Sequence, residues 1–174
     1  MIREVITYPN KLLRTKSKDV EKFDNELHTL LDDMFETMIA QDGVGLAAIQ
    51  VSVPLNVLLI CIPDENGVQT PDNVLEAINP TITRKEGQIV FTEGCLSVPE
   101  VHEEIKRSQN ISVEYFDRDG NKHAIEAEEF LAVVWQHEVD HLEGHLFIEK
   151  LSLLKRKKFE KEWKKKLKEA KKNK

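Results

Sequence analysis

The chain has 174 residues, of which 40% are hydrophobic and 32% charged, a composition that suits one globular domain and excludes a disordered chain. No run approaches the roughly 20 apolar residues of a membrane span, and the first ten residues lack a signal-peptide pattern. We therefore expect a cytoplasmic protein without membrane attachment. The net charge of −6 is uneven, because Lys155–Lys174 holds 12 Lys or Arg against 3 Glu and the rest holds 13 against 28 Asp or Glu. A basic tail on an acidic body favours contact with an anionic partner, and the alternative is a helix that its lysines keep solvated.

The first half of the chain predicts one helix followed by strands. Asp24 can cap a helix over 25–41, in which leucines and methionines recur every three or four residues and so form one buried face. Asp42-Gly43-Val44-Gly45 ends this helix, and its two glycines permit a close backbone approach. Short strands are expected in three places: 55–63, 74–83 and 88–91.

The second half predicts a hairpin and two helices. Residues 92–99 break the strand pattern and are expected to form a loop of special geometry. Residues 111–116 and 122–127 should pair across a turn with a left-handed glycine, before a helix over 128–143 and a lysine-rich helix over 151–172. Because the strands precede the helix over 128–143 instead of alternating with helices, we predict an α+β fold with antiparallel or mixed sheets around this central helix.

That central helix carries the pattern His-Glu-x-x-His at residues 137–141. Residues four apart share one face of a helix, so His137 and His141 can bind a single metal ion. Glu138 lies about 100° around the helix from His137, beside the ion, where a carboxylate can accept and return a proton. The pattern predicts a metal-dependent hydrolase.

The third ligand is the open question. Cys95 is the best candidate, because a thiolate is a strong ligand and Gly94 leaves its approach clear. His145 follows the glycine that should end the helix, and other peptidases with this motif use a downstream glutamate, for which Glu160 and Glu162 are in range. Three ligands would leave a catalytic position open, whereas Cys61 as a fourth would make a structural site. Its apolar surroundings indicate that Cys61 is instead a core residue.

A hydrolytic site also needs hydrogen-bond donors for the oxyanion that forms during the reaction. The peptide N–H of Leu96 and the side-chain amide of Gln50 are the candidates.

Three stretches together resemble the signature motifs of peptide deformylase, in the same order along the chain: 43–50, 93–97 and 137–141. Residues 8–14 resemble its N-terminal motif as well. The resemblance implies hydrolysis of the N-formyl group from the formyl-methionine of new proteins, with release of formate. It also implies one divalent metal ion, natively Fe²⁺, which Zn²⁺ or Ni²⁺ replaces.

The resemblance assigns roles to single residues. Cys95, His137 and His141 would hold the metal, Glu138 would be the general acid and base, and Gln50 with the Leu96 N–H would stabilise the oxyanion. Gly45 and its neighbours would bind the substrate as an added strand. Five residues would line the methionine pocket: Val44, Phe91, Phe130, Val133 and Val134.

The resemblance gives further expectations for single residues and for the domain, and the charge of the tail gives one for its partner. Glu93, in the substrate site, should pair with Arg107 as a brace behind the metal ligands, and His102 departs from the family by standing where many members have Arg. Residues 1–150 should form the catalytic domain, with 151–174 as an extension of it. The basic extension is expected to dock on ribosomal RNA near the exit tunnel, without sequence-specific recognition of nucleic acid.

Two other classes remain open at this point. An endopeptidase with the same histidine motif would use a third ligand other than Cys95. A non-enzymatic module stabilised by metal would use Cys61 as its fourth ligand.

Overall fold

The computed structural model describes residues 1–174 and confirms the α+β class. Five strands form one antiparallel sheet in the order β1-β2-β3-β6-β7: β1 (Gly45–Ala47), β2 (Val57–Ile60), β3 (Leu75–Glu86), β6 (Asn110–Phe116) and β7 (Lys122–Glu128). A second sheet is the hairpin of β4 (Ile89–Cys95) and β5 (Val98–Arg107). Every strand pair is antiparallel, so the sheets are not mixed.

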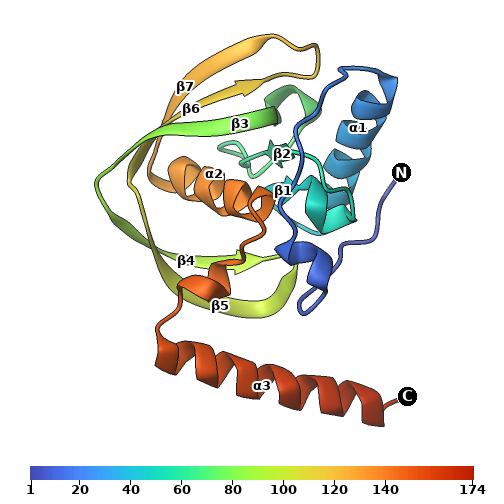
Figure 1. The fold of residues 1–174 in the computed structure, drawn as a ribbon, viewed down its shortest axis with the longest axis vertical. Helices are drawn as coiled ribbons and strands as arrows, with labels where there is room; N and C mark the ends of the chain where they lie inside the picture. Colours follow the sequence, from blue (N-terminus) through green and yellow to red (C-terminus); the bar gives the residue numbers. More distant parts are fainter.

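Helix α2 (Glu129–Leu142) lies between the two sheets (Figure 1). Its Ala132 and Trp135 belong to a core cluster that also contains residues of β2 and β6, while His137 stacks on Phe147. Gly144 ends the helical segment with φ +83°, and a Cβ atom there would lie 2.6 Å from the carbonyl oxygen of Arg14. The predicted helix and its terminating glycine are thus confirmed.

Helix α1 (Asn25–Ala40) matches the prediction within one residue. The Asp24 side chain accepts a hydrogen bond from the Leu27 N–H at 3.1 Å, which satisfies one of the free donors at the helix start. The predicted apolar face is buried against β1 and β2: Leu27, Leu30, Leu31, Met34 and Met38.

The prediction of a loop over residues 92–99 is wrong. β4 continues through Cys95, and β5, which the sequence did not predict, returns from Val98. The inward positions of this hairpin include Glu93 and Arg107, which bond to each other. Because these buried side chains are charged, the alternation of apolar residues that identifies a strand is missing.

Helix α3 (Leu153–Lys172) lies below β5 at the edge of the molecule (Figure 1). Phe159 is buried in a cluster with Leu13 and Val98, and Trp163 lies edge-on to Tyr8. Two other apolar residues of this helix, Leu154 and Leu167, are 80% and 42% exposed. None of the helices combines the length with the hydropathy that a membrane crossing needs.

Candidate metal centre and substrate pocket

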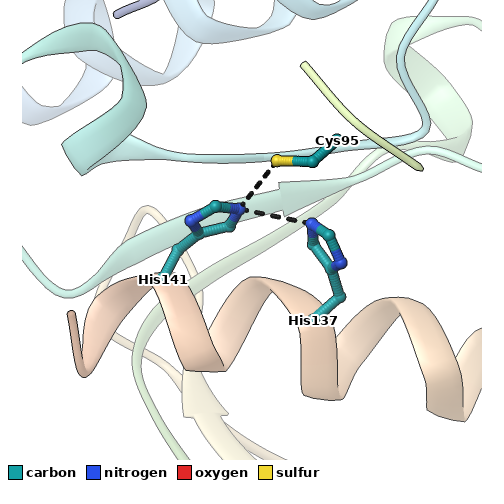
Figure 2. Close-up of side chains that lie close together, drawn as sticks. All are labelled: Cys95, His137 and His141. Atoms are coloured by element: carbon teal, nitrogen blue, oxygen red, sulfur yellow. Dashed lines mark hydrogen bonds between the residues drawn. The ribbon is translucent and has the colours of Figure 1, made fainter. Parts of the chain in front are cut away.

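Three metal-binding side chains converge at one point (Figure 2). Cys95 ends β4, whereas His137 and His141 stand one turn apart on α2. The Nε2 atom of His141 lies 3.3 Å from the Cys95 sulfur and 3.2 Å from Nε2 of His137. All three donor atoms lie within 4.8 Å of one another, so a single ion can contact all of them.

The surroundings of these atoms fit a bound cation. One thiolate and two imidazoles form a donor set for zinc or iron. Burial and the nearby positive charge of His137 hold the pKa of His141 well below its usual range, which keeps that ring in the neutral form that binds metal. Burial opposes charge on His137, but bonds to Cys95 and Glu93 raise its pKa. The donor cluster therefore favours a positive charge among its atoms.

A buried ion pair holds the hairpin against the metal helix. Glu93 receives two hydrogen bonds from Arg107, both 2.8 Å long, and Arg107 also donates to Asp140 at 2.6 Å. The Nδ1–H of His137 donates to Glu93 at 2.8 Å, which leaves Nε2 of the same ring free for a metal. Burial would raise the pKa of Glu93, but Arg107 and His137 lower it to about 2. Glu93 therefore stays charged and fixes the orientation of His137.

Glu138 lies beside the donor cluster and is only 4% exposed. Its Oε2 atom is buried without a hydrogen-bond partner. Burial raises its pKa to about 7, so near neutral pH the carboxyl group can both accept and donate a proton. Gly45 leaves the space that this carboxylate occupies, because a Cβ atom there would lie 2.6 Å from Glu138 Oε1.

The side-chain amide of Gln50 has a defined orientation. Its Oε1 atom accepts a hydrogen bond from the Ala47 N–H at 2.9 Å. Its Nε2 atom donates to the Ser97 hydroxyl at 3.0 Å and lies 3.8 Å from the Cys95 sulfur. The NH₂ group of Gln50 thus faces Cys95, one of the three metal-binding side chains. Leu96, which follows Cys95, lines the same cavity as Gln50.

A cavity of about 540 Å³ opens beside these groups. The structure brings all the residues expected in the substrate site to its wall: Val44, Gly45, Phe91, Glu93, Phe130, Val133 and Val134. Phe91 and Phe130 contact each other, with ring centroids 5.1 Å apart. His102 also lines the cavity, and a Cβ atom on Gly94 would lie 2.9 Å from its ring. Gly94 therefore makes room for His102.

The alternative ligands lie outside the donor cluster. Cys61 is buried in the core with its sulfur 3.2 Å from Oδ1 of Asn73, and His145 faces Glu149 at 3.5 Å. The sequence reasoning missed two polar residues, Ser97, which bonds to Gln50, and Asp140, which bonds to Arg107. Asp140 was within reach of prediction, because it stands inside the histidine motif on the same face as His137.

Comparison with known proteins agrees with this geometry. The sequence model of the polypeptide deformylase family matches residues 2–157. A peptide deformylase of Campylobacter jejuni is 59% identical over 175 residues, which cover 100% of both chains. A crystal structure of a peptide deformylase from Legionella pneumophila has a TM-score of 0.89 at 38% identity, covering 100% of this chain and 99% of that one.

A second solved relative is the peptide deformylase of Ehrlichia chaffeensis in complex with actinonin. It has a TM-score of 0.86 at 40% identity, and the match covers 95% of this chain and 97% of the other. These similarities extend over nearly the whole sequence, including all three stretches that form the donor cluster and the cavity. The chain therefore belongs to the polypeptide deformylase family, whose members are enzymes that remove the formyl group from new polypeptides.

Proposed function

We propose that this chain is a metal-dependent amide hydrolase that cleaves the N-formyl group from N-terminal formyl-methionine and releases formate. The observation that carries the proposal is the position of Glu138, whose buried carboxyl group lines the same cavity as Cys95 and His137, two of the three metal-binding side chains. Because the Ehrlichia relative is solved with actinonin, we expect actinonin to bind this chain as well.

Cys95, His137 and His141 would hold one divalent cation, with Fe²⁺ as the expected native ion and Zn²⁺ or Ni²⁺ as substitutes. Such an ion supplies a Lewis acid that activates water and polarises a carbonyl oxygen. Two imidazoles and one thiolate leave room for a substrate at the cation, as a catalytic site requires.

In the proposed reaction, Glu138 accepts the proton of the attacking water. It returns this proton to the methionine nitrogen when the bond between the formyl carbon and that nitrogen breaks. A pKa of about 7 suits both transfers, because neither state of the carboxyl group is strongly favoured near neutral pH. The Gln50 amide and the Leu96 N–H donate to the oxygen on which negative charge develops.

The substrate is proposed to bind as an extra strand beside β1. This strand forms one end of the five-stranded sheet, so one edge of its backbone has no partner strand and can pair with an extended peptide. The apolar side chains at the cavity wall would then enclose the methionine side chain: Val44, Phe91, Phe130, Val133 and Val134.

The remaining proposals concern the basic tail and the location of the protein in the cell. Residues 1–150 would form the catalytic unit in the cytoplasm, and 151–174 an extension of the same domain that docks on ribosomal RNA. Lys155 and Lys166 bond to Glu103 and Glu100 of β5, whereas most other lysines of α3 have no acidic partner. These lysines leave a basic surface available to phosphate groups.

The deciding experiment compares Glu138→Gln with Glu143→Gln, a matched change at an exposed residue that pairs only with Lys16. Both variants should retain the metal, measured by elemental analysis. We expect Glu138→Gln to lower turnover of formyl-Met-Ala-Ser by about 10²-fold or more, with Glu143→Gln unchanged. Normal turnover in Glu138→Gln would remove the proposed role of this carboxylate.

A further inference from the structure

Gln69 lies in the loop between β2 and β3, and its side chain reaches the segment that lines the cavity. Its Nε2 atom donates to the carbonyl oxygen of Gly43 at 2.9 Å and to that of Cys61 at 2.5 Å. Because both neighbours are carbonyl oxygens, only the NH₂ end of the amide can face them. One side chain thus joins the loop, the end of β2 and the residue that precedes Val44.

The loop holds Gln69 in place from both sides. Before it, the Asp64 side chain accepts hydrogen bonds from the N–H groups of Asn66 and Val68 at 2.8 and 2.9 Å. After it, the Thr70 N–H donates to Oδ1 of Asn73 at 2.8 Å. Gln69 is half-buried, whereas the residues from Pro63 to Val68 are exposed. The loop therefore presents this side chain inward from a fixed backbone.

Besides the pairing of Gly45 with Ile60 in the sheet, two backbone hydrogen bonds hold the segment that Gln69 contacts. The Gly43 N–H donates to the Met38 carbonyl, and the Val44 carbonyl accepts from the Cys61 N–H, both at 2.9 Å. Two of its three residues, Gly43 and Gly45, are glycines, which lose more conformational freedom on ordering than any other residue. β1 itself is only three residues long. If this edge is not ordered before a peptide pairs with it, the free energy of ordering the edge reduces the affinity for the peptide.

We propose that Gln69 is a positioning residue that orders the edge Gly43–Gly45 for substrate binding. This inference rests on the proposed function, since it assumes that the edge pairs with a formyl-methionyl peptide. Gln69 does not line the cavity and acts only through the backbone of Gly43. Its loss should weaken peptide binding and leave the chemical step at the donor cluster intact.

The test uses nickel-loaded wild type, Gln69→Leu, Gln69→Asn and Gln69→Glu, with Gln109→Leu as the matched control. Gln109 also donates from Nε2, to Glu129 at 2.8 Å, but it directly precedes β6, which two strands separate from β1. KM and kcat for formyl-Met-Ala-Ser are measured separately, together with amide hydrogen exchange of residues 42–46. The affinity for the product peptide Met-Ala-Ser gives a readout that needs no turnover.

For Gln69→Leu we expect KM to rise by about 5- to 30-fold, the effect of one lost hydrogen bond, with kcat within about twofold. Gln69→Asn, whose side chain is one methylene too short to reach, should raise KM by a similar factor. Gln69→Glu should raise KM further, because its carboxylate faces two carbonyl oxygens. Exchange at residues 42–46 should accelerate in all three and stay unchanged in Gln109→Leu.

An unchanged KM in Gln69→Leu, or a loss of kcat at constant KM, would overturn the positioning role while leaving the proposed function standing. If wild type itself released no formate, the proposed function would fail instead. The exchange rates and the product affinity would then decide alone whether Gln69 orders the edge.

Discussion

Gly45 lies so close to the Glu138 side chain that any larger residue at position 45 would require one of the two to move. A Cβ atom on Gly45 would lie 2.6 Å from Oε1 and 2.9 Å from the carboxyl carbon of Glu138. Gly45 belongs to β1 and Glu138 to α2, so the contact joins the proposed peptide-binding edge to the proposed general base. The glycine sets where that carboxylate can lie.

We therefore expect Gly45→Ala to lower kcat for formyl-Met-Ala-Ser by about 10²-fold, because the methyl group displaces the carboxylate from the attacking water. Metal content should be unchanged. Glu138→Asp shortens the side chain by one methylene and so withdraws the carboxylate from the added methyl group. It should therefore cost less activity in the Gly45→Ala background than in wild type. A double-mutant cycle measures this coupling, and simple additivity of the two losses would contradict the explanation.

The two cysteines provide a matched pair for the metal site. Cys95→Ala should lose the metal, measured after dialysis by elemental analysis, because the sulfur is one of only three protein donors in the cluster. Cys61→Ala should keep the metal and lose only packing, since its sulfur contacts Asn73 in the core. Retention of metal in Cys95→Ala would favour the endopeptidase alternative, which needs a different third ligand.

The ion pair of Arg107 and Glu93 is expected to dominate the stability of this region. Arg107→Met leaves the Glu93 carboxylate buried without its partner, which should reduce the free energy of unfolding by about 3–5 kcal/mol. Arg118 is the control, because it also bonds to two carboxylates, those of Glu76 and Asp32, but is about one-third exposed. Arg118→Met should cost at most about 1 kcal/mol. Urea unfolding of both variants measures the difference, and equal losses would contradict it.

The turn between β6 and β7 predicts a pH dependence of stability. His123 donates to the Asp117 carboxylate at 2.7 Å, and the backbone N–H groups of Asp119 and Asn121 donate to it as well. The bond from His123, followed by these backbone bonds, holds the pKa of Asp117 below its usual range. A carboxyl group with a lowered pKa stabilises the fold above its unfolded-state pKa and loses this contribution as the pH falls through its folded-state pKa.

Asp117→Asn should therefore lower the free energy of unfolding more at about pH 5 than at about pH 3, where wild type has lost part of the same contribution. Asp119→Asn is the control in the same turn, because the Asp119 side chain accepts none of these hydrogen bonds. Urea titrations at the two pH values measure both variants. A pH-independent effect of Asp117→Asn would count against the assignment.

The basic face of α3 can be tested without disturbing its attachment. Lys155 and Lys166, which bond to β5, are kept, and four other lysines are changed to Gln: Lys164, Lys165, Lys168 and Lys171. We expect weaker ribosome binding at low salt and a smaller dependence of affinity on salt, with normal turnover of small peptides. The control changes four lysines elsewhere: Lys11, Lys18, Lys22 and Lys85. Cosedimentation with ribosomes measures binding, and equal affinity of both sets would refute a specific role of α3.

The sequence predicts α1 and α2 to within one residue because each has a signal at one end and a helical period. Asp24 starts α1, Gly144 follows α2, and the buried faces recur every three to four residues. The donor cluster was also within reach, since the spacing of His137 and His141 is set by the helix itself. Cys95 was the best candidate for the third ligand on its chemistry alone, but only the resemblance to a family assigned it, because no local rule states that a residue about 40 positions earlier lies over that helix.

The hairpin could not be predicted for a physical reason. A strand is recognised by apolar residues at alternate positions, but here Glu93 and Arg107 occupy inward positions and neutralise each other. Their burial depends on a partner from the other strand, which a local pattern cannot show. The Gln69 contact escaped prediction likewise, because it depends on the course of a loop that approaches Gly43 only in the folded chain.

Glu93 and Arg107 of the hairpin bond to each other, and they also bond to His137 and Asp140 of α2. Protein atoms alone therefore hold the hairpin against α2. Polypeptide assembly and acquisition of the ion can then be separate events in time. A chelator should remove the ion from such a centre without unfolding the chain, and a shortage of the metal should leave folded, inactive molecules that can be reloaded.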